Sequence, residues 1–225
     1  MVHVREIDGN PVRFGHSGWL WHNTFLLYDH ATESLWHPVT GRAMSGPMRG
    51  RRLRTLPVSF LTWRAWRAEH PGTLVLRKPQ ADVDDYAGRN ARMTFGYAVD
   101  VGAASRIWQF SDLPAAGAVE DEVGGTPVVV VRDMAAEAAF VYERPAEGGR
   151  TVSFDWDARG PGGRPVLRER GGSRAWFART GLPVPGTDAR EPLRQLPGSD
   201  WEAAAWALQH PWGTRYAPRS SQEGR

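Results

Sequence analysis

Hydrophobic positions in this chain come in short runs that glycine and proline repeatedly interrupt. The clearest run is Val128–Val131, four β-branched residues after a Gly-Gly-Thr-Pro turn. A short apolar run bounded by turn residues is typical of a strand buried on both faces. Ala139–Tyr142 is the next such run, and we expect it to pair with the first run as a hairpin. The remaining runs predict further short strands rather than long helices.

Two segments predict short helices. Ser199-Asp200-Trp201-Glu202 matches a capping box with Ser199 as the N-cap, and Ser59 holds the corresponding place upstream. Each helix would end at a His-Pro pair, because proline cannot donate the next backbone hydrogen bond. The two pairs are His70-Pro71 and His210-Pro211. We expect both imidazoles to cap the last helical turn.

Both segments belong to a longer repeat. Residues 9–71 align with residues 149–211 without a gap, at a constant offset of 140, and 17 of the 63 pairs are identical. Self-similarity of this kind indicates a duplicated structural module. The sequence therefore predicts an α+β, β-rich fold of two related modules, each made of short antiparallel strands closed by one capped helix. The shared tryptophans are interpreted as core residues: Trp36, Trp66, Trp176 and Trp206.

The repeat predicts the domain organisation. Residues 1–76 form a first, partial module, 77–92 a linker, 93–216 a second, complete module, and 217–225 a disordered tail. The second module has a front arm, roughly 93–147, without a counterpart, and Val141-Tyr142-Glu143 corresponds to Met1-Val2-His3 by the same offset. Met1 is therefore expected not to be the true start of the first module. An omitted upstream segment, the arm of the second module, or a second chain in a homo-oligomer could cover the open sheet edge.

Composition narrows the function classes. The 225 residues include no cysteine, which rules out disulfides and thiolate metal sites, and no apolar stretch is long enough to cross a bilayer. The net charge is +3, and the densest basic run, Arg49–Arg54, is interpreted as a solvated turn. We expect neither a nucleic-acid nor a membrane partner. As written, the chain is expected to be soluble and cytoplasmic, or exported if an upstream signal peptide exists.

One cluster of polar residues is a candidate ligand site. The first module has carboxylates and hydroxyls next to Trp36, and this mixture is suited to a small-molecule pocket. The second module has mostly arginine and glycine at the corresponding positions. The same residues could instead close a tight turn through their own backbone groups. The candidate ligand-binding residues are Ser17, Asp29, Thr32, Glu33, Ser34 and Trp36.

Two further hypotheses concern chemistry. Asp29 and Glu33 could act as an acid–base pair in a hydrolase-like enzyme if the fold placed them across a cleft. Alternatively, histidines near the N-terminus could bind zinc or copper: His16, His22, His30 and His37. No nucleophile elbow or phosphate loop is present. The sequence predicts no cofactor and favours a non-enzymatic binding or structural module.

The first copy also carries an ordered series of short motifs. They are Phe14-Gly15, Ser17-Gly18, Tyr28-Asp29, Thr32–Trp36, Thr40-Gly41, Gly46-Pro47, Leu56-Pro57, Thr62-Trp63, Trp66 and His70-Pro71. Their order and spacing resemble a prokaryotic domain of unknown function, family 3179, strongly over residues 12–75 and more weakly over 95–214. The resemblance implies a bacterial origin and names no activity.

Two departures limit what the resemblance implies. Modules of that family typically have a Cys-Pro-x-Cys-like stretch after a strand of the front arm, and many members are exported. Here Val131-Arg132-Asp133-Met134 occupies that region, so no metal or redox role based on cysteine can be transferred. His16, His22 and His37 stand where the family usually has other residues, so the resemblance does not support a histidine metal site.

Overall fold

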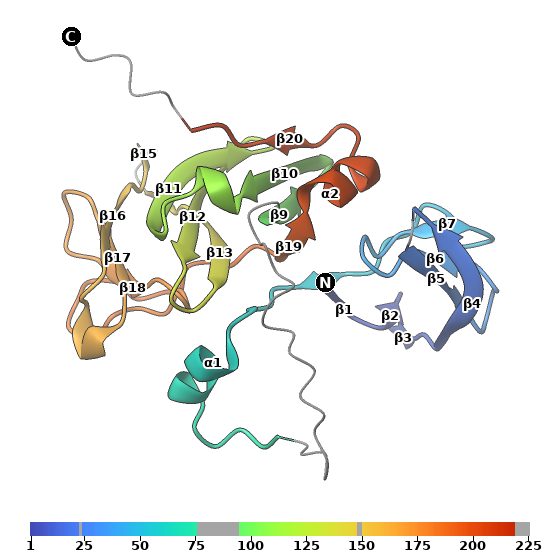
Figure 1. Ribbon diagram of the computed structural model, residues 1–225, viewed down its shortest axis with the longest axis horizontal. Helices are drawn as coiled ribbons and strands as arrows, with labels where there is room; N and C mark the ends of the chain where they lie inside the picture. The colour runs from blue at the N-terminus through green and yellow to red at the C-terminus, as the bar shows by residue number, and fades with distance from the viewer. Residues whose placement is uncertain (23, 76–94, 148–149, 219–225) are drawn as a thin grey trace. The chain divides into compact units, whose positions relative to one another are not determined.

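The computed structural model describes residues 1–22, 24–75, 95–147 and 150–218 (Figure 1). They form two compact units. Unit 1 comprises Met1–Val58 and Pro197–Ser199, and unit 2 comprises Ser59–Leu196 and Asp200–Arg225. The predicted linker 77–92 and all but the first two residues of the predicted tail 217–225 lie outside the described residues. The predicted module boundaries therefore stay predictions.

Unit 1 is built on a four-stranded antiparallel sheet with the order β4-β5-β6-β7. Strands β4 and β5 form a hairpin that pairs Phe14 with Asp29 and Leu20 with Phe25, with an irregularity between His16 and Leu20. Strand β2 pairs with β3, and β1 pairs with β8. The strands are β1 (Val2–His3), β2 (Glu6–Ile7), β3 (Asn10–Pro11), β4 (Phe14–Trp21), β5 (Thr24–Asp29), β6 (Leu35–Trp36), β7 (Ala43–Ser45) and β8 (Thr55–Leu56).

Unit 2 begins with helix α1 (Trp63–Glu69), which is followed by five strands that we call the arm: β9 (Phe95–Val101), β10 (Ala104–Gln109), β11 (Ala116–Val123), β12 (Thr126–Asp133) and β13 (Ala138–Glu143). Strands β11, β12 and β13 form one sheet, and β9 and β10 lie in a second sheet of order β19-β9-β10-β20. A third sheet has the order β16-β17-β18. The remaining elements are β14 (Ala146–Glu147), β15 (Arg150–Thr151), β16 (Phe154–Asp157), β17 (Val166–Glu169), β18 (Ala175–Phe177), β19 (Gly198–Glu202), α2 (Ala203–Gln209), β20 (Thr214–Arg215) and the 3₁₀ turns Phe110–Asp112 and Pro161–Gly163.

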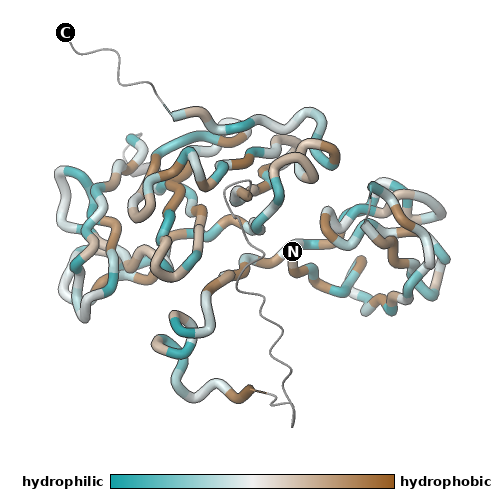
Figure 2. The backbone as a smooth tube through the Cα atoms, in the orientation of Figure 1, coloured by the Kyte–Doolittle hydropathy of each residue, from teal (hydrophilic) through white to brown (hydrophobic). Residues whose placement is uncertain are grey.

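Strand β12 forms the centre of unit 2 and appears as a hydrophobic segment in Figure 2. Val128–Val131 are completely buried, which confirms the predicted strand with two buried faces. Side chains alternate across a strand, so its two faces contact different clusters. Val129 and Val131 belong to the cluster that includes β16–β18, whereas Val128 and Val130 belong to the cluster that includes β9 and β10. The predicted hairpin with Ala139–Tyr142 is also confirmed.

The helix N-caps differ from the prediction. Thr62 caps α1 and Glu202 caps α2, each by accepting a hydrogen bond from the backbone N–H three residues on. The predicted N-caps, Ser59 and Ser199, are wrong. Ser199 is buried within β19, which continues directly to Glu202, so the helix begins later than the capping-box pattern indicates. The predicted ends are correct, because the C-caps are His70 and His210.

Local geometry recurs at the sequence offset of 140. His30 N–H donates to the Arg13 carbonyl at 3.0 Å, and Arg170 N–H donates to the Ser153 carbonyl at 2.8 Å. The rings of Phe14 and Trp36 lie 5.7 Å apart at 81°, and those of their counterparts Phe154 and Trp176 lie 5.7 Å apart at 82°. These pairs support the predicted duplication. The described residues contain two α-helices and several small sheets, which confirms the predicted β-rich α+β fold.

Strand β1 departs from the constant offset. His3 Nε2 lies 3.0 Å from the Pro38 carbonyl oxygen, and the Tyr142 hydroxyl donates to the Ala178 carbonyl at 3.1 Å. His3 therefore occupies the place of Tyr142, at an offset of 142 − 3 = 139. The predicted correspondence of Met1-Val2-His3 with residues 141–143 is out of phase by one residue. Strand β1 is equivalent to the second half of β13.

Candidate functional site

Asp29 is the centre of a closed hydrogen-bond network in unit 1. Trp36 Nε1–H donates to Asp29 Oδ2 at 2.9 Å, and the backbone N–H of Thr32 donates to Oδ1 at 2.6 Å. The Thr32 hydroxyl lies 2.8 Å from Oδ2 and 2.7 Å from the Ser34 hydroxyl, which in turn accepts from Met48 N–H at 3.0 Å. Asp29, Ser34 and Trp36 are all buried. Four of the six predicted site residues thus contact one another: Asp29, Thr32, Ser34 and Trp36.

These hydrogen bonds also determine the charge state of the carboxyl group. Burial raises the pKa of Asp29, but hydrogen bonds from the Trp36 indole and from Thr32 outweigh burial, so the pKa lies below its ordinary value. Asp29 is therefore ionised at neutral pH and holds the turn to Ser34. Glu33 is exposed on this turn with a φ of 56°, and the Ser17 hydroxyl donates to the Leu26 carbonyl at 2.7 Å. The turn-closing hypothesis describes these contacts better than a ligand pocket does.

The four candidate metal ligands lie in different surroundings. The rings of His16, His22 and His30 lie beside the aromatic rings of Phe25, Trp21 and Tyr28, respectively. His37 is buried, and its Nδ1 accepts from the backbone N–H of Thr40 at 3.2 Å. Within the described part of the chain, no group of three or more His, Asp or Glu residues could hold a metal ion.

The second repeat replaces this network with an ion pair. Glu169, the counterpart of Asp29, accepts two hydrogen bonds of 2.8 Å from Arg174, the counterpart of Ser34. This pairing lowers the pKa of Glu169. The indole of Trp176 donates to the Glu191 carbonyl at 2.9 Å instead of to a carboxylate. A longer acid and an arginine thus occupy the place of three small polar side chains.

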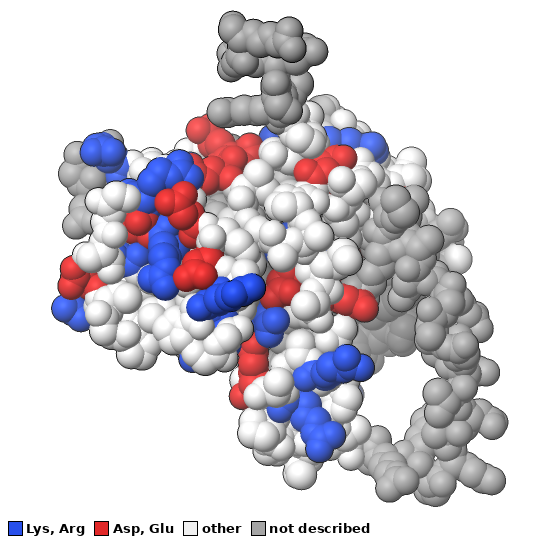
Figure 3. Space-filling model, turned by 60° about the vertical axis from the view of Figure 1, so that its left-hand side comes forward, with Lys and Arg blue, Asp and Glu red and all other residues white. Residues whose placement is uncertain are grey.

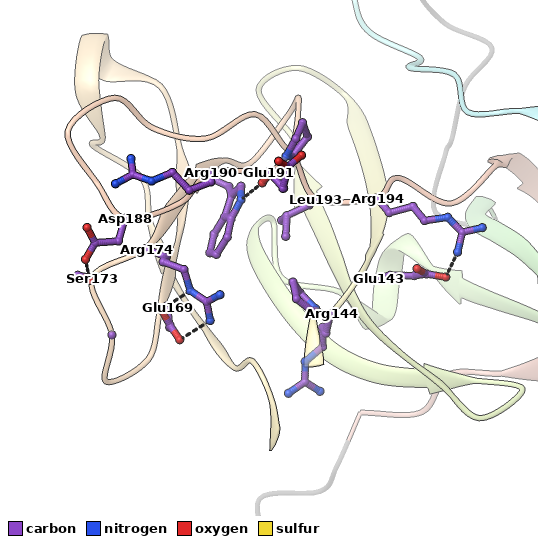
Figure 4. A pocket seen from close by; sticks show the side chains of 14 residues that line it. Glu143, Arg144, Glu169, Ser173, Arg174, Asp188, Arg190, Glu191, Leu193 and Arg194 are labelled. Atoms are coloured by element: carbon purple, nitrogen blue, oxygen red, sulfur yellow. Dashed lines mark hydrogen bonds and ion pairs between the residues drawn. The ribbon is translucent and has the colours of Figure 1, made fainter. Parts of the chain in front are cut away.

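A cavity of about 740 Å³ lies next to this ion pair (Figure 4). Its lining comes from three separated stretches, residues 143–145, 169–176 and 188–194, which is why sequence reasoning did not find it. Arginines and acidic residues balance in number: Arg144, Arg174, Arg190 and Arg194 against Glu143, Glu169, Asp188 and Glu191. Charges of both signs are likewise interspersed on the face in Figure 3. This balance selects neither anions nor cations as ligands.

One side of the β4–β5 hairpin in unit 1, which we call the open face, carries the apolar side chains Phe14, Leu20, Phe25 and Leu27 together with exposed His16, which lies opposite Leu27. Phe25, Leu27 and Asp29 alternate along β5 and therefore point to one side of the sheet. Leu20 and Phe14 lie directly opposite Phe25 and Asp29 and share that side. Leu20 is 69% exposed and Phe25 46% exposed, whereas Phe14 and Leu27 are half-buried.

In the second repeat the equivalent sheet face is buried and lacks the exposed apolar pair. Phe154 and Leu167, the counterparts of Phe14 and Leu27, are buried. The counterparts of Leu20 and Phe25 are Gly160 and Pro165, so the exposed apolar pair occurs in the first repeat alone. A large exposed apolar patch is typical of an interaction surface. Sequence reasoning missed it because strand register decides which side chains share a face.

The fold and these surfaces define a β-rich, two-unit protein with paired structural motifs and an exposed apolar sheet face. Residues 1–95 match a family model described as Protein of unknown function (DUF3179), which confirms the resemblance over this part of the chain. The weaker resemblance over 95–214 stays a prediction. No curated protein and no solved structure matches the chain. No helix within the described ranges has the length and apolarity needed to span a membrane.

Proposed function

We propose that this chain is a non-enzymatic binding module that recognises another polypeptide through the open face of unit 1. The single observation that carries this proposal is the exposure of Leu20 and Phe25 on one side of the β4–β5 hairpin. Burying the exposed part of these two side chains would contribute about 1–2 kcal/mol each. A partner that covered them would recover this free energy.

The contrast between the repeats supports a recognition role over a structural one. Both repeats keep the aromatic pair, Phe14–Trp36 and Phe154–Trp176, that packs each module. The exposed pair Leu20 and Phe25 is absent from the second repeat, so module folding does not require it. The opposite side of the same hairpin tip adds Trp19 and Trp21, which are also exposed. Large aromatic side chains of this kind dominate protein interfaces.

A peptide-display selection tests the proposal. A library of random peptides of about 20 residues, long enough to form a hairpin, is selected on the full chain and counter-selected on the double variant Leu20→Asp, Phe25→Asp. We expect clones that bind the wild type and lose at least about tenfold in affinity on the variant. Ser17→Ala, which keeps the apolar pair, is the matched control. Clones that bind both proteins equally would contradict the proposal.

A further inference from the structure

The two repeats differ in what lies beside their equivalent tryptophans. In the first repeat, Met48 is half-buried and packs in the cluster that contains Trp36. Its counterpart at the offset of 140 is Asp188, which is exposed and accepts a hydrogen bond from the Ser173 hydroxyl. Asp188 and Trp176 both line the cavity of the second repeat. A carboxylate and an open space thus stand where the first repeat packs a methionine.

The cavity has the size and lining of a small-molecule site. Its volume of about 740 Å³ lies within the range of about 300–1,000 Å³ that is usual for ligand pockets. Pro145, Pro192, Leu193 and Trp176 give the lining apolar surface beside its charged groups. All lining residues belong to unit 2, so the cavity lies within one compact unit. A ligand that fills it needs both apolar and hydrogen-bonding surfaces.

Three arginines of the lining already pair with carboxylates, and Figure 4 shows the first two of these pairs: Arg174 with Glu169, Arg194 with Glu143, and Arg144 with Glu120. Arg174 donates to both oxygens of Glu169 at 2.8 Å, and these side chains are only 21% and 19% exposed. A charged ligand group would have to displace one partner and leave it without a counter-charge in a half-buried place, which costs free energy. The lining therefore disfavours charged ligand groups.

Neutral hydroxyl groups can bind to such a pair without opening it. A hydroxyl both donates and accepts, and a carboxylate has about four lone-pair sites. Glu169 can therefore accept from a ligand hydroxyl while it keeps both hydrogen bonds from Arg174. Arg190 and Glu191 add one charge of each sign at exposed positions of the lining, so they introduce no net preference. These properties favour a neutral ligand with many hydroxyl groups.

From these contacts we propose that the cavity beside Glu169 and Arg174 binds a neutral saccharide. The hydroxyl groups of the sugar bind the ion pair, and the C–H faces of its rings pack against the apolar part of the lining, to which Pro145 and Pro192 belong. The site is built from residues of unit 2. It is therefore independent of the open face of unit 1 and goes beyond the proposed recognition of a polypeptide.

A glycan array tests the ligand class. The full chain is applied to immobilised neutral, anionic and cationic glycans, among them the neutral N-acetylglucosamine trimer and its deacetylated, cationic form as a matched pair. We expect binding to neutral glycans that changes less than about twofold between about 50 and about 500 mM salt, because salt screens only charged groups. No binding to any neutral glycan, or binding to charged glycans alone, would overturn the proposal.

Charge-neutral variants test the residues. The double variant Glu169→Gln, Arg174→Gln loses the ion pair, and we expect its affinity for the strongest neutral glycan of the array to fall at least about tenfold. The matched control is Asp155→Asn, Arg170→Gln, which neutralises an exposed pair outside the lining. We expect this control to bind like the wild type. Equal affinity of the folded double variant and the control would overturn the proposed site.

Amide shifts of the wild-type chain keep the proposal testable if the double variant does not fold. The full chain is titrated with the same glycan while NMR records each backbone amide. We expect shift changes concentrated in 143–145, 169–176 and 188–194, the three stretches that line the cavity. Changes confined to other residues would overturn the inference.

Discussion

Trp36 and Asp29 are joined by a buried hydrogen bond of 2.9 Å that has no equivalent in the second repeat, where Trp176 donates to a backbone carbonyl. The first repeat therefore depends on a carboxylate for its turn. Asp29→Ala should leave the indole and the Thr32 amide without acceptors. We expect a loss of about 2–4 kcal/mol in the unfolding free energy of unit 1. Denaturant unfolding of the full chain measures it, with exposed Glu33→Ala as the control. A change below about 0.5 kcal/mol for Asp29→Ala would contradict this role.

Two glycines at equivalent positions should differ in their tolerance to alanine. Gly46 and Gly186 both have a φ of 83°, so each substitution should cost about 1 kcal/mol of backbone strain. A Cβ at Gly46 would also lie 2.7 Å from the Ser34 hydroxyl, whereas a Cβ at Gly186 would meet nothing within 4 Å. Gly46→Ala should therefore destabilise the protein more than Gly186→Ala. Matched thermal unfolding curves compare them, and equal shifts would refute the clash.

The stability of unit 1 should depend on pH through His3. Burial, together with the N-terminus and Arg52, lowers the pKa of His3 below its ordinary value despite two backbone hydrogen bonds. The unfolded state then binds a proton more readily than the folded state once the pH falls below about 6.5. Unit 1 should lose stability between pH 7.5 and 5. His3→Tyr, which introduces the residue found at position 142, should remove this dependence. Urea midpoints at both pH values provide the measurement.

Arg179 should hold helix α1 on unit 2. It pairs with Asp133 at 2.7 Å and with Glu69 of α1 at 3.0 Å, and the Asp133 side chain is only 6% exposed. Arg179→Ala would leave Asp133 buried without its partner, with an expected cost of about 1–3 kcal/mol. Arg170→Ala, whose pair with Asp155 lies in solvent, should change stability too little to resolve. Hydrogen exchange should show faster opening of α1 in Arg179→Ala alone.

The sequence predicted the elements better than it predicted the surfaces. The valine run and the His-Pro helix ends depend on neighbouring residues, so local pattern was enough to locate β12 and both C-caps. The N-cap prediction was wrong because β19 continues through Ser199, which only tertiary pairing decides. Four of the six candidate ligand residues form hydrogen bonds with one another, and a ligand at this cluster stays a prediction. The open face depends on the register between β4 and β5, which the residue pattern alone does not specify.

The division between the two compact units does not follow the division between the two repeats. Helix α1 belongs to the first repeat by sequence and to unit 2 by its contacts with Ala136 and Arg179. Cooperativity of unfolding follows contacts rather than sequence similarity. We therefore expect unit 1, which also includes Pro197–Ser199, to unfold in a separate step that leaves α1 native. Two segments that resemble each other in sequence thus need not form two equal folding units.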